Sequence, residues 1–122
     1  AGTIARLEER DLSPLRCGYR APYILAAARA VDSGKLDLEA LSKSDAASAK
    51  RTLMSMRGIG EKVANCVILF SLRIGSAFPI DVWMKKAIAQ HYPDGFDPEV
   101  FGENAGLAQQ YMFYYQRSGM AK

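Results

Sequence analysis

Lys62 closes the stretch RGIGEK, residues 57–62, in which two glycines lie on either side of an isoleucine. We expect a helix to begin here, and the positive end of a helix dipole disfavours an ammonium group in the first turn. A neutral amine is a nucleophile, and lysine is the usual residue that forms Schiff bases with electrophilic carbons. The alternative interpretation is an ordinary surface lysine with no chemical role.

Asp81 is the second candidate, and it follows Lys62 by 19 residues in the stretch FPIDVWMKKA. An aspartate directly before a helix is typical of an N-cap, which is the structural interpretation of this residue. The same carboxylate can also face a cleft, hold Lys62 in place and stabilise positive charge that develops on a sugar. Together the two residues are candidates for covalent catalysis at a sugar carbon.

The glycines next to Lys62 are candidates for a phosphate-binding turn. Without Cβ atoms, the backbone N–H groups of Gly58, Gly60 and Val63 can converge on one anion at the start of the helix. Ile59 would turn inward and pin the two flanking helices together. A nucleic-acid phosphate suits such a site and would be bound regardless of base sequence. A plain turn between two helices is the alternative, because short glycine motifs are common.

Length and composition favour one compact all-α domain. The 122 residues are 49% hydrophobic, which suits a single core, and helical spacing recurs along the chain without any alternating strand pattern. The net charge of +3, from 16 basic and 13 acidic residues, permits an anionic partner without requiring one. Basic residues nonetheless occupy two stretches without any acidic residue, 12–31 and 46–60.

The cysteine content and the hydropathy exclude other classes of protein. Cys17 and Cys66 are the only cysteines, too few for a disulfide scaffold or an iron–sulfur cluster. No apolar run approaches the ~18 residues that span a bilayer, and the first residues lack the apolar core of a signal peptide. We therefore expect a soluble intracellular protein, in the cytoplasm and nucleoid or in a nucleus, that does not bind membranes.

Helices are expected to position these residues. The first covers residues 20–35, with Pro22 in its first turn and Gly34 as a left-handed C-cap. Ser44 is expected to cap the next helix, residues 45–56. One apolar stripe of this helix comprises Ala46, Ala49, Leu53 and Met56.

Three more helices are predicted after the glycine hairpin. Residues 62–74 are apolar almost all round, as expected of a central helix that its neighbours bury on every side. Asp81 caps the following helix, residues 82–92, which stops at Pro93 and Gly95. A final helix covers residues 104–118.

The stretch LMSMRGIGEKVANCVILFSL, followed by AFPIDVWM, resembles the helix-hairpin-helix signature of the DNA glycosylase superfamily. Within it, the chain is most similar to the C-terminal part of the 8-oxoguanine DNA glycosylase/AP lyases, through Cys66 and the segments LRCGYRAPYILAAARAV and FGENAGLAQQYMFYY. The resemblance covers residues 15–118 and implies one helical domain, 1–122, with the hairpin at about 57–62. The N-terminal domain that this family usually has is expected to be absent.

The resemblance implies removal of an oxidised purine from duplex DNA. Lys62 would attack C1′ of an extruded nucleotide with Asp81 as its carboxylate partner, and the Schiff base would then permit strand nicking by β-elimination. Cys66 and Phe113 would hold the purine between them, and Gln109 would contact its Watson–Crick edge. For these last three residues, core packing or an uninvolved helix surface is the alternative.

The resemblance also implies contacts to the rest of the DNA. Tyr19 and Arg20 would wedge the base stack and contact the cytosine opposite the lesion, unless Tyr19 only packs in the core. A hydrated K⁺ or Na⁺ ion can bridge the hairpin carbonyls to the DNA phosphate. The phosphate contacts are assigned to Gly58, Gly60, Val63 and Arg57, and the cation to the carbonyls of Met54, Met56 and Ile59. Arg57 stands where the family usually has proline, and Trp83 stands where a histidine is common.

The expected partner is therefore double-stranded DNA containing a damaged base, bound by a monomer that requires no cofactor and has no iron–sulfur cluster. An endonuclease III-like glycosylase/lyase is one alternative, although such enzymes commonly carry a four-cysteine cluster. Adenine-specific and alkylpurine-specific relatives often lack the lysine. A catalytically silent helix-hairpin-helix module that binds only the DNA backbone, and a purely structural helical domain, remain as alternatives of another class.

Overall fold

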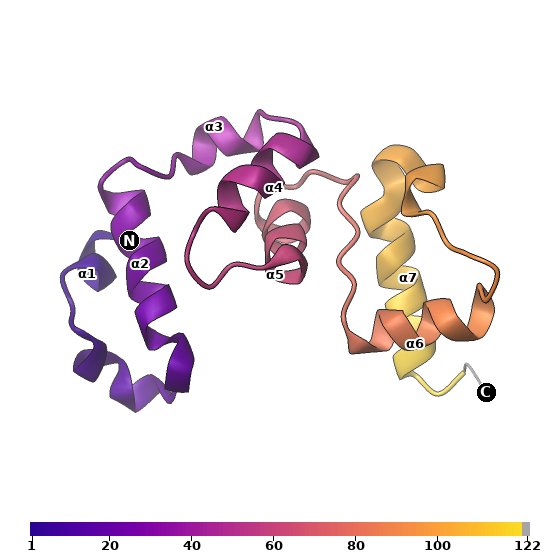
Figure 1. The fold of residues 1–122 in the computed structure, drawn as a ribbon, viewed down its shortest axis with the longest axis horizontal. Helices are drawn as coiled ribbons and strands as arrows, with labels where there is room; N and C mark the ends of the chain where they lie inside the picture. Colours follow the sequence, from indigo (N-terminus) through magenta and orange to yellow (C-terminus); the bar gives the residue numbers. More distant parts are fainter. Residues whose placement is uncertain (121–122) are drawn as a thin grey trace.

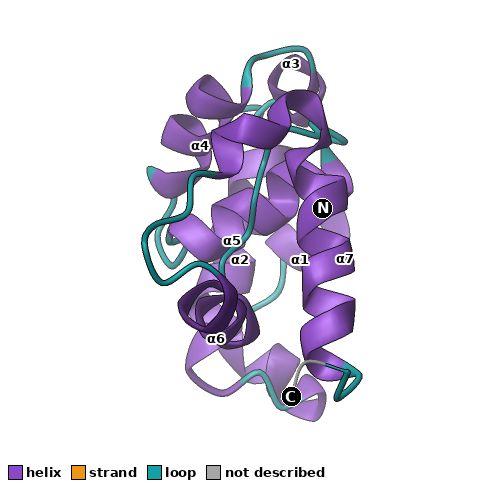
Figure 2. Cartoon of the chain, turned by 90° about the vertical axis from the view of Figure 1, so that its right-hand side faces the viewer, coloured by secondary structure: helices purple, strands orange, loops and turns teal. Residues whose placement is uncertain are grey.

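The computed structural model describes residues 1–120, which form helices joined by loops (Figure 2). No strand occurs in this part of the chain, so the all-α prediction is confirmed. Within the same residues, no helix is both long and apolar enough to cross a membrane. The α-helices are α1 (Gly2–Ala5), α2 (Ala21–Asp32), α3 (Leu38–Ser42), α4 (Ala46–Met54), α5 (Glu61–Cys66), α6 (Val82–His91) and α7 (Ala105–Arg117). Short 3₁₀ segments cover Glu9–Leu15, Gly18–Arg20 and Pro98–Asn104, and a π-helical turn, Val67–Ser71, continues α5.

The helices form three groups along the long axis of the molecule (Figure 1). Helices α1 and α2 lie at one end, α3 to α5 in the middle, and α6 and α7 at the other end. Each group has its own apolar cluster, and the middle cluster is the largest. Ala77 belongs to the middle cluster and Phe78 to the C-terminal one, so the segment before α6 joins the two.

Helix α2 follows the prediction closely. It begins at Ala21 with Pro22 in its first turn, where the missing N–H costs no hydrogen bond. It ends at Asp32, and Gly34 has the left-handed φ of +79° that was expected after it. Its buried residue Leu25 belongs to the N-terminal cluster, and its buried residue Ala30 belongs to the middle cluster.

The N-cap of α4 is Asp45, so the prediction of Ser44 was wrong. Asp45 Oδ1 accepts a hydrogen bond of 2.8 Å from the Ser48 backbone N–H, whereas the Ser44 hydroxyl donates to the Leu41 carbonyl at 2.8 Å. Ser44 therefore hydrogen-bonds to the end of the preceding helix. Asp45, whose backbone is extended, caps α4 with its carboxylate. The predicted apolar stripe is confirmed, because Ala49 and Leu53 are buried.

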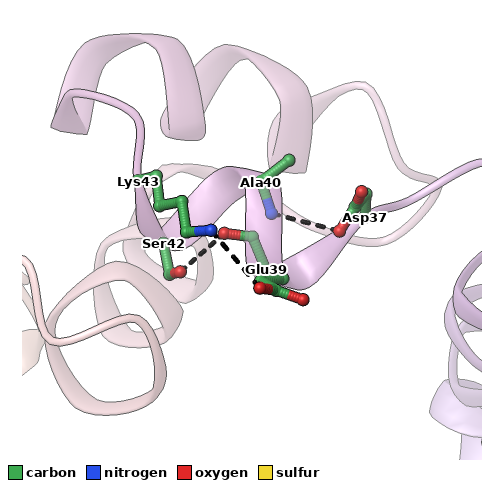
Figure 3. Close-up of polar contacts among 5 residues, drawn as sticks. All are labelled: Asp37, Glu39, Ala40, Ser42 and Lys43. Carbon is green, nitrogen blue, oxygen red and sulfur yellow. Dashed lines mark hydrogen bonds and ion pairs between the residues drawn. The ribbon is translucent and has the colours of Figure 1, made fainter.

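Helix α3 was not predicted, and local polar contacts define its short span (Figure 3). The Asp37 carboxylate accepts from the Ala40 backbone N–H at 3.1 Å and so caps the start of the helix. Near its end, Lys43 forms an exposed ion pair of 3.3 Å with Glu39, one helical turn away. Exposed pairs of this kind stabilise a helix by only ~0.3–0.5 kcal/mol, so packing of Leu41 in the middle cluster is the larger contribution.

The helix after the hairpin is not buried all round, which corrects the expectation from its sequence. Ala64, Ile68 and Leu72 are buried at intervals of four residues, whereas Val63 and Phe70 are 43% and 57% exposed. The segment packs against α4, and its residue Leu69 lies against Gly106 at the start of α7. Hydrophobicity alone therefore overstated the number of neighbours that this helix has.

Helices α6 and α7 confirm the last two predictions. The Asp81 carboxylate caps α6, which ends at His91 ahead of Pro93 and Gly95. In Figure 1, α6 crosses the C-terminal half of α7. The side chains of Gln116 and Gln90 hydrogen-bond at 3.2 Å and tie the two helices together.

Candidate functional site

The hairpin between α4 and α5 is fixed by its packing against α2. Gly58 has a φ of +85°, and a Cβ atom at this position would overlap the ring of Tyr23. Ile59 donates its backbone N–H to the Met56 carbonyl at 3.2 Å and packs against the middle cluster, so its predicted inward orientation is confirmed. The fold therefore requires glycine at position 58 for two separate reasons.

Gly60 differs from Gly58, because the fold gives no reason for glycine at this position. It is the N-cap of α5 with an extended backbone, φ −90° and ψ −174°, which any residue adopts. A Cβ atom at Gly60 would meet no atom within 4 Å. The first N–H groups of a helix have no intrahelical acceptor, and Val63 lies in that first turn. An outside group can therefore approach the backbone here.

Lys62 lies in the first turn of α5, is exposed, and lines a cavity of about 630 Å³. The cavity lies where the middle group meets the segment before α6 and the first turns of α6 itself. Its polar lining comprises Lys50, Glu61, Lys62, Asn65, Ser76, Lys85 and Glu99, and its apolar lining Ala46, Ala47, Ala77, Phe78, Ile80 and Pro98.

An ion pair between α4 and α5 lies beside Lys62. The ammonium group of Lys50 donates to Glu61 Oε1 at 2.6 Å. This hydrogen bond, and then the charge of Lys50, lowers the pKa of the Glu61 carboxyl below its usual value. The nearest carboxylate along the chain is therefore already paired, which leaves the Lys62 amine to other partners.

The structure confirms Asp81 as the N-cap of α6. Its Oδ1 accepts a hydrogen bond of 2.8 Å from the Met84 backbone N–H. Its Oδ2 makes no hydrogen bond to any residue from 1 to 120, so one carboxylate oxygen is available to a ligand. Asp81 does not itself line the cavity around Lys62, but its neighbour Ile80 and Lys85 in the next turn do.

The three predicted base-pocket residues come from two groups of helices. Cys66 is a half-buried free thiol at the end of α5, whereas Gln109 and Phe113 lie one turn apart on α7. Gln109 is 4% exposed, and its Nε2 donates to the Pro79 carbonyl at 3.1 Å. None of the three lines the cavity around Lys62. Their role in holding a purine stays a prediction.

Tyr19 and Arg20 are exposed at the turn before α2. The Arg20 guanidinium lies 4.7 Å from the Tyr19 ring centroid, and the Tyr19 and Tyr23 rings meet edge to face at 6.5 Å. The guanidinium of Arg57 lies 5.6 Å from the centroid of the Tyr23 ring. Tyr23 was not among the predicted site residues, although its spacing of four from Tyr19 was an available signal. In Figure 1 the beginnings of α2 and α6 lie at the lower edge, on either side of the hairpin.

The carbonyls of Met54, Met56 and Ile59 are of a chemical type that suits a monovalent cation. Carbonyl oxygens are hard ligands, and each has two lone pairs. The Met56 carbonyl uses one of them for the N–H of Ile59 and retains the other. No group of three or more His, Cys, Asp or Glu residues in the described chain could hold a metal ion. The K⁺ or Na⁺ site stays a prediction.

The chain is similar to DNA glycosylases, although no protein-family model matches it. A probable N-glycosylase/DNA lyase of Methanothermobacter thermautotrophicus is 32% identical over 120 residues, which cover 90% of this chain and 38% of that protein. A DNA-3-methyladenine glycosylase of Bacillus subtilis is 40% identical over 79 residues, covering 64% of this chain and 26% of that protein.

A solved structure agrees with these sequence relatives. It is the 8-oxoguanine glycosylase/lyase of Clostridium acetobutylicum in complex with double-stranded DNA containing cytosine opposite 8-oxoguanine. The TM-score is 0.86 and the sequence identity 34%, over 96% of this chain and 43% of that one. The chain thus spans less than half the length of each of these proteins.

Proposed function

Because the chain belongs to the helix-hairpin-helix DNA glycosylase superfamily, we propose that it excises 8-oxoguanine from double-stranded DNA and nicks the abasic strand. The observation that supports this most directly is the position of Lys62. The amine lies in the first turn of α5, directly after a glycine hairpin, and lines a cavity of about 630 Å³. Cavities of a few hundred Å³ suit nucleotide-sized ligands. The enzyme acts wherever the cell holds its DNA.

Lys62 supplies the nucleophile for this reaction. Its neutral amine attacks C1′ of an extruded nucleotide, and the electrons of the glycosidic bond leave with the base, which takes up a proton. Loss of a proton from the nitrogen and opening of the sugar ring give a Schiff base. Removal of a C2′ proton then expels the 3′ phosphate and breaks the strand. Hydrolysis of the Schiff base releases the amine.

Asp81 supplies the fixed negative charge. Because its Oδ1 caps α6, the carboxylate is held in one orientation, and its Oδ2 is available to face positive charge on the sugar. Such charge develops as the glycosidic bond lengthens. Removal of Asp81 would therefore cost both the helix cap and the electrostatic stabilisation.

The first experiment is borohydride trapping, which reduces a Schiff base to a stable protein–DNA adduct. The chain, its Lys62→Gln variant and its Lys85→Gln variant are each incubated with duplexes that contain 8-oxoguanine, an abasic site or neither. Lys85 is the matched control, because it is a lysine that lines the same cavity. We expect adducts on the first two duplexes, which disappear in Lys62→Gln and persist in Lys85→Gln.

The outcomes separate the alternatives. Trapping on the abasic duplex alone would indicate a lyase without a functional lesion pocket. Adducts that persist in Lys62→Gln would assign the nucleophile to another amine. If no duplex is trapped although all bind equally, the chain acts as a DNA-binding module, and the proposed function is wrong.

A further inference from the structure

Trp83 in the first turn of α6 lies among basic side chains from two helices. The ammonium group of Lys86 is 5.1 Å from its ring centroid, and the guanidinium of Arg117, on α7, is 5.4 Å from the same ring. Arg117 also lies 5.7 Å from the ring of Phe113, one turn earlier on α7. We call Trp83, Lys86 and Arg117 the tryptophan cluster.

The two cations of the tryptophan cluster have no carboxylate partner in the described chain. The ion pairs among residues 1–120 are Arg10–Glu8, Lys43–Glu39 and Lys50–Glu61, and neither Lys86 nor Arg117 takes part. Helices α6 and α7 contain no Asp or Glu at all. The acidic residue nearest to Lys86 along the chain is Asp81, and no ion pair joins the two among the described residues. Two positive charges therefore converge on one exposed ring without compensation.

The ring faces hold these cations while leaving their donors free. A guanidinium stacked on an aromatic face keeps its N–H groups, which lie in its own plane, available for a second ligand. Those N–H groups match the oxygen atoms of a phosphate in a bidentate arrangement. Trp83 is 38% exposed, so the cluster is open to a ligand of this kind.

We propose that the tryptophan cluster binds a phosphodiester group of the DNA strand that contains the target nucleotide. The choice of strand rests on the proposed function and on the predicted role of Phe113 in holding the extruded base. The Arg117 guanidinium lies 5.7 Å from the centroid of the Phe113 ring, so it would lie next to a base that stacks on this side chain. The phosphate on Arg117 would then lie close to the extruded nucleotide, and Lys86 would extend the contact along the strand.

Salt-dependent binding tests the tryptophan cluster independently of catalysis. Affinity for a duplex with a non-cleavable abasic-site analogue is measured over a series of KCl concentrations for wild type, Arg117→Gln and Lys86→Gln. Each lost phosphate contact should reduce the slope of log K against log salt by about one. The control is Lys43→Gln, because Lys43 lies on α3 and is paired with Glu39. Arg117→Lys should keep the slope but bind more weakly, since it lacks the bidentate fork.

The fluorescence of Trp83 provides a second measurement, because it is the only tryptophan in the chain. We expect the DNA analogue to protect Trp83 from acrylamide quenching, with the same Kd that the binding assay gives, and this protection to weaken in Arg117→Gln. If Arg117→Gln and Lys86→Gln keep the wild-type slope and Trp83 stays open to quencher, the inference is wrong. Trapping at Lys62 would be unaffected by that result, so the inference and the proposed function fail separately.

Discussion

The ring of Tyr23 lies directly against the backbone of Gly58, so closely that a Cβ atom at position 58 would overlap it. This contact joins α2 to the hairpin before α5, across a separation of 35 residues in sequence. Gly58 also has a left-handed φ of +85°, so both this backbone conformation and the Tyr23 ring restrict position 58 to glycine. The position of Lys62, four residues later, depends on this packing.

We expect Gly58→Ala to lower the free energy of unfolding by about 2–5 kcal/mol, since left-handed backbone costs an L-residue ~1–2 kcal/mol and overpacking ~1–3 kcal/mol. Urea denaturation measures the change. In the Tyr23→Ala background the overlap is absent, so the same substitution should cost less. Equal costs in both backgrounds would show that the Tyr23 ring does not constrain Gly58.

Gly60→Ala should leave the free energy of unfolding within about 1 kcal/mol of wild type, because a methyl group at this N-cap meets no atom. Binding of duplex DNA should nevertheless weaken about tenfold, since the methyl group would lie between the phosphate and the backbone N–H groups. Fluorescence anisotropy with a labelled duplex measures the affinity. Unchanged affinity would mean that the phosphate does not approach the hairpin backbone at this residue.

Gln109→Leu should destabilise the chain by about 1–3 kcal/mol, because the buried Pro79 carbonyl would lose its hydrogen-bond donor. The proposed function adds a second effect. Trapping on 8-oxoguanine duplex should fall more than trapping on abasic duplex, which has no base to recognise. Gln110→Leu is the control, since Gln110 is exposed and its amide contacts only Gln109. Equal losses on both duplexes would assign Gln109 a structural role alone.

Asp45 should make the stability of the fold depend on acid pH. A hydrogen bond from the Ser48 backbone N–H, followed by one from the Ser48 hydroxyl, holds the pKa of the Asp45 carboxyl below its usual value of 3.8. A pKa that is lower in the folded state means that this stabilisation is complete above 3.8 and is lost as pH falls through the folded-state pKa.

Asp45→Asn isolates this contribution, because asparagine also caps a helix but does not titrate. Urea midpoints of wild type and variant are compared from neutral to acid pH. The advantage of wild type should shrink as the carboxyl becomes protonated, while all other acidic groups act equally in both proteins. Two parallel curves would contradict the assignment.

The amino-acid sequence alone was sufficient for features that depend on neighbours within a few residues. Pro22 and Gly34 marked the ends of α2, and Asp81 marked the start of α6, because a cap acts on the backbone two or three residues away. The class of fold, the hairpin and the resemblance to DNA glycosylases followed from the same local patterns. Lys62 was identified as a candidate nucleophile because it lies two residues after Gly60 in the sequence.

The tertiary structure decided what depends on distant residues. Ser44 and Asp45 are both good caps, and only the end of α3 determined which of them serves α4. The exposed face of the helix after the hairpin could not be predicted, because hydrophobicity does not say how many neighbours a helix has. The contact of Tyr23 with Gly58, the cavity around Lys62 and the approach of Arg117 to Trp83 each join segments far apart in sequence. Side-chain packing between helices creates these relationships, and no local pattern of residues contains them.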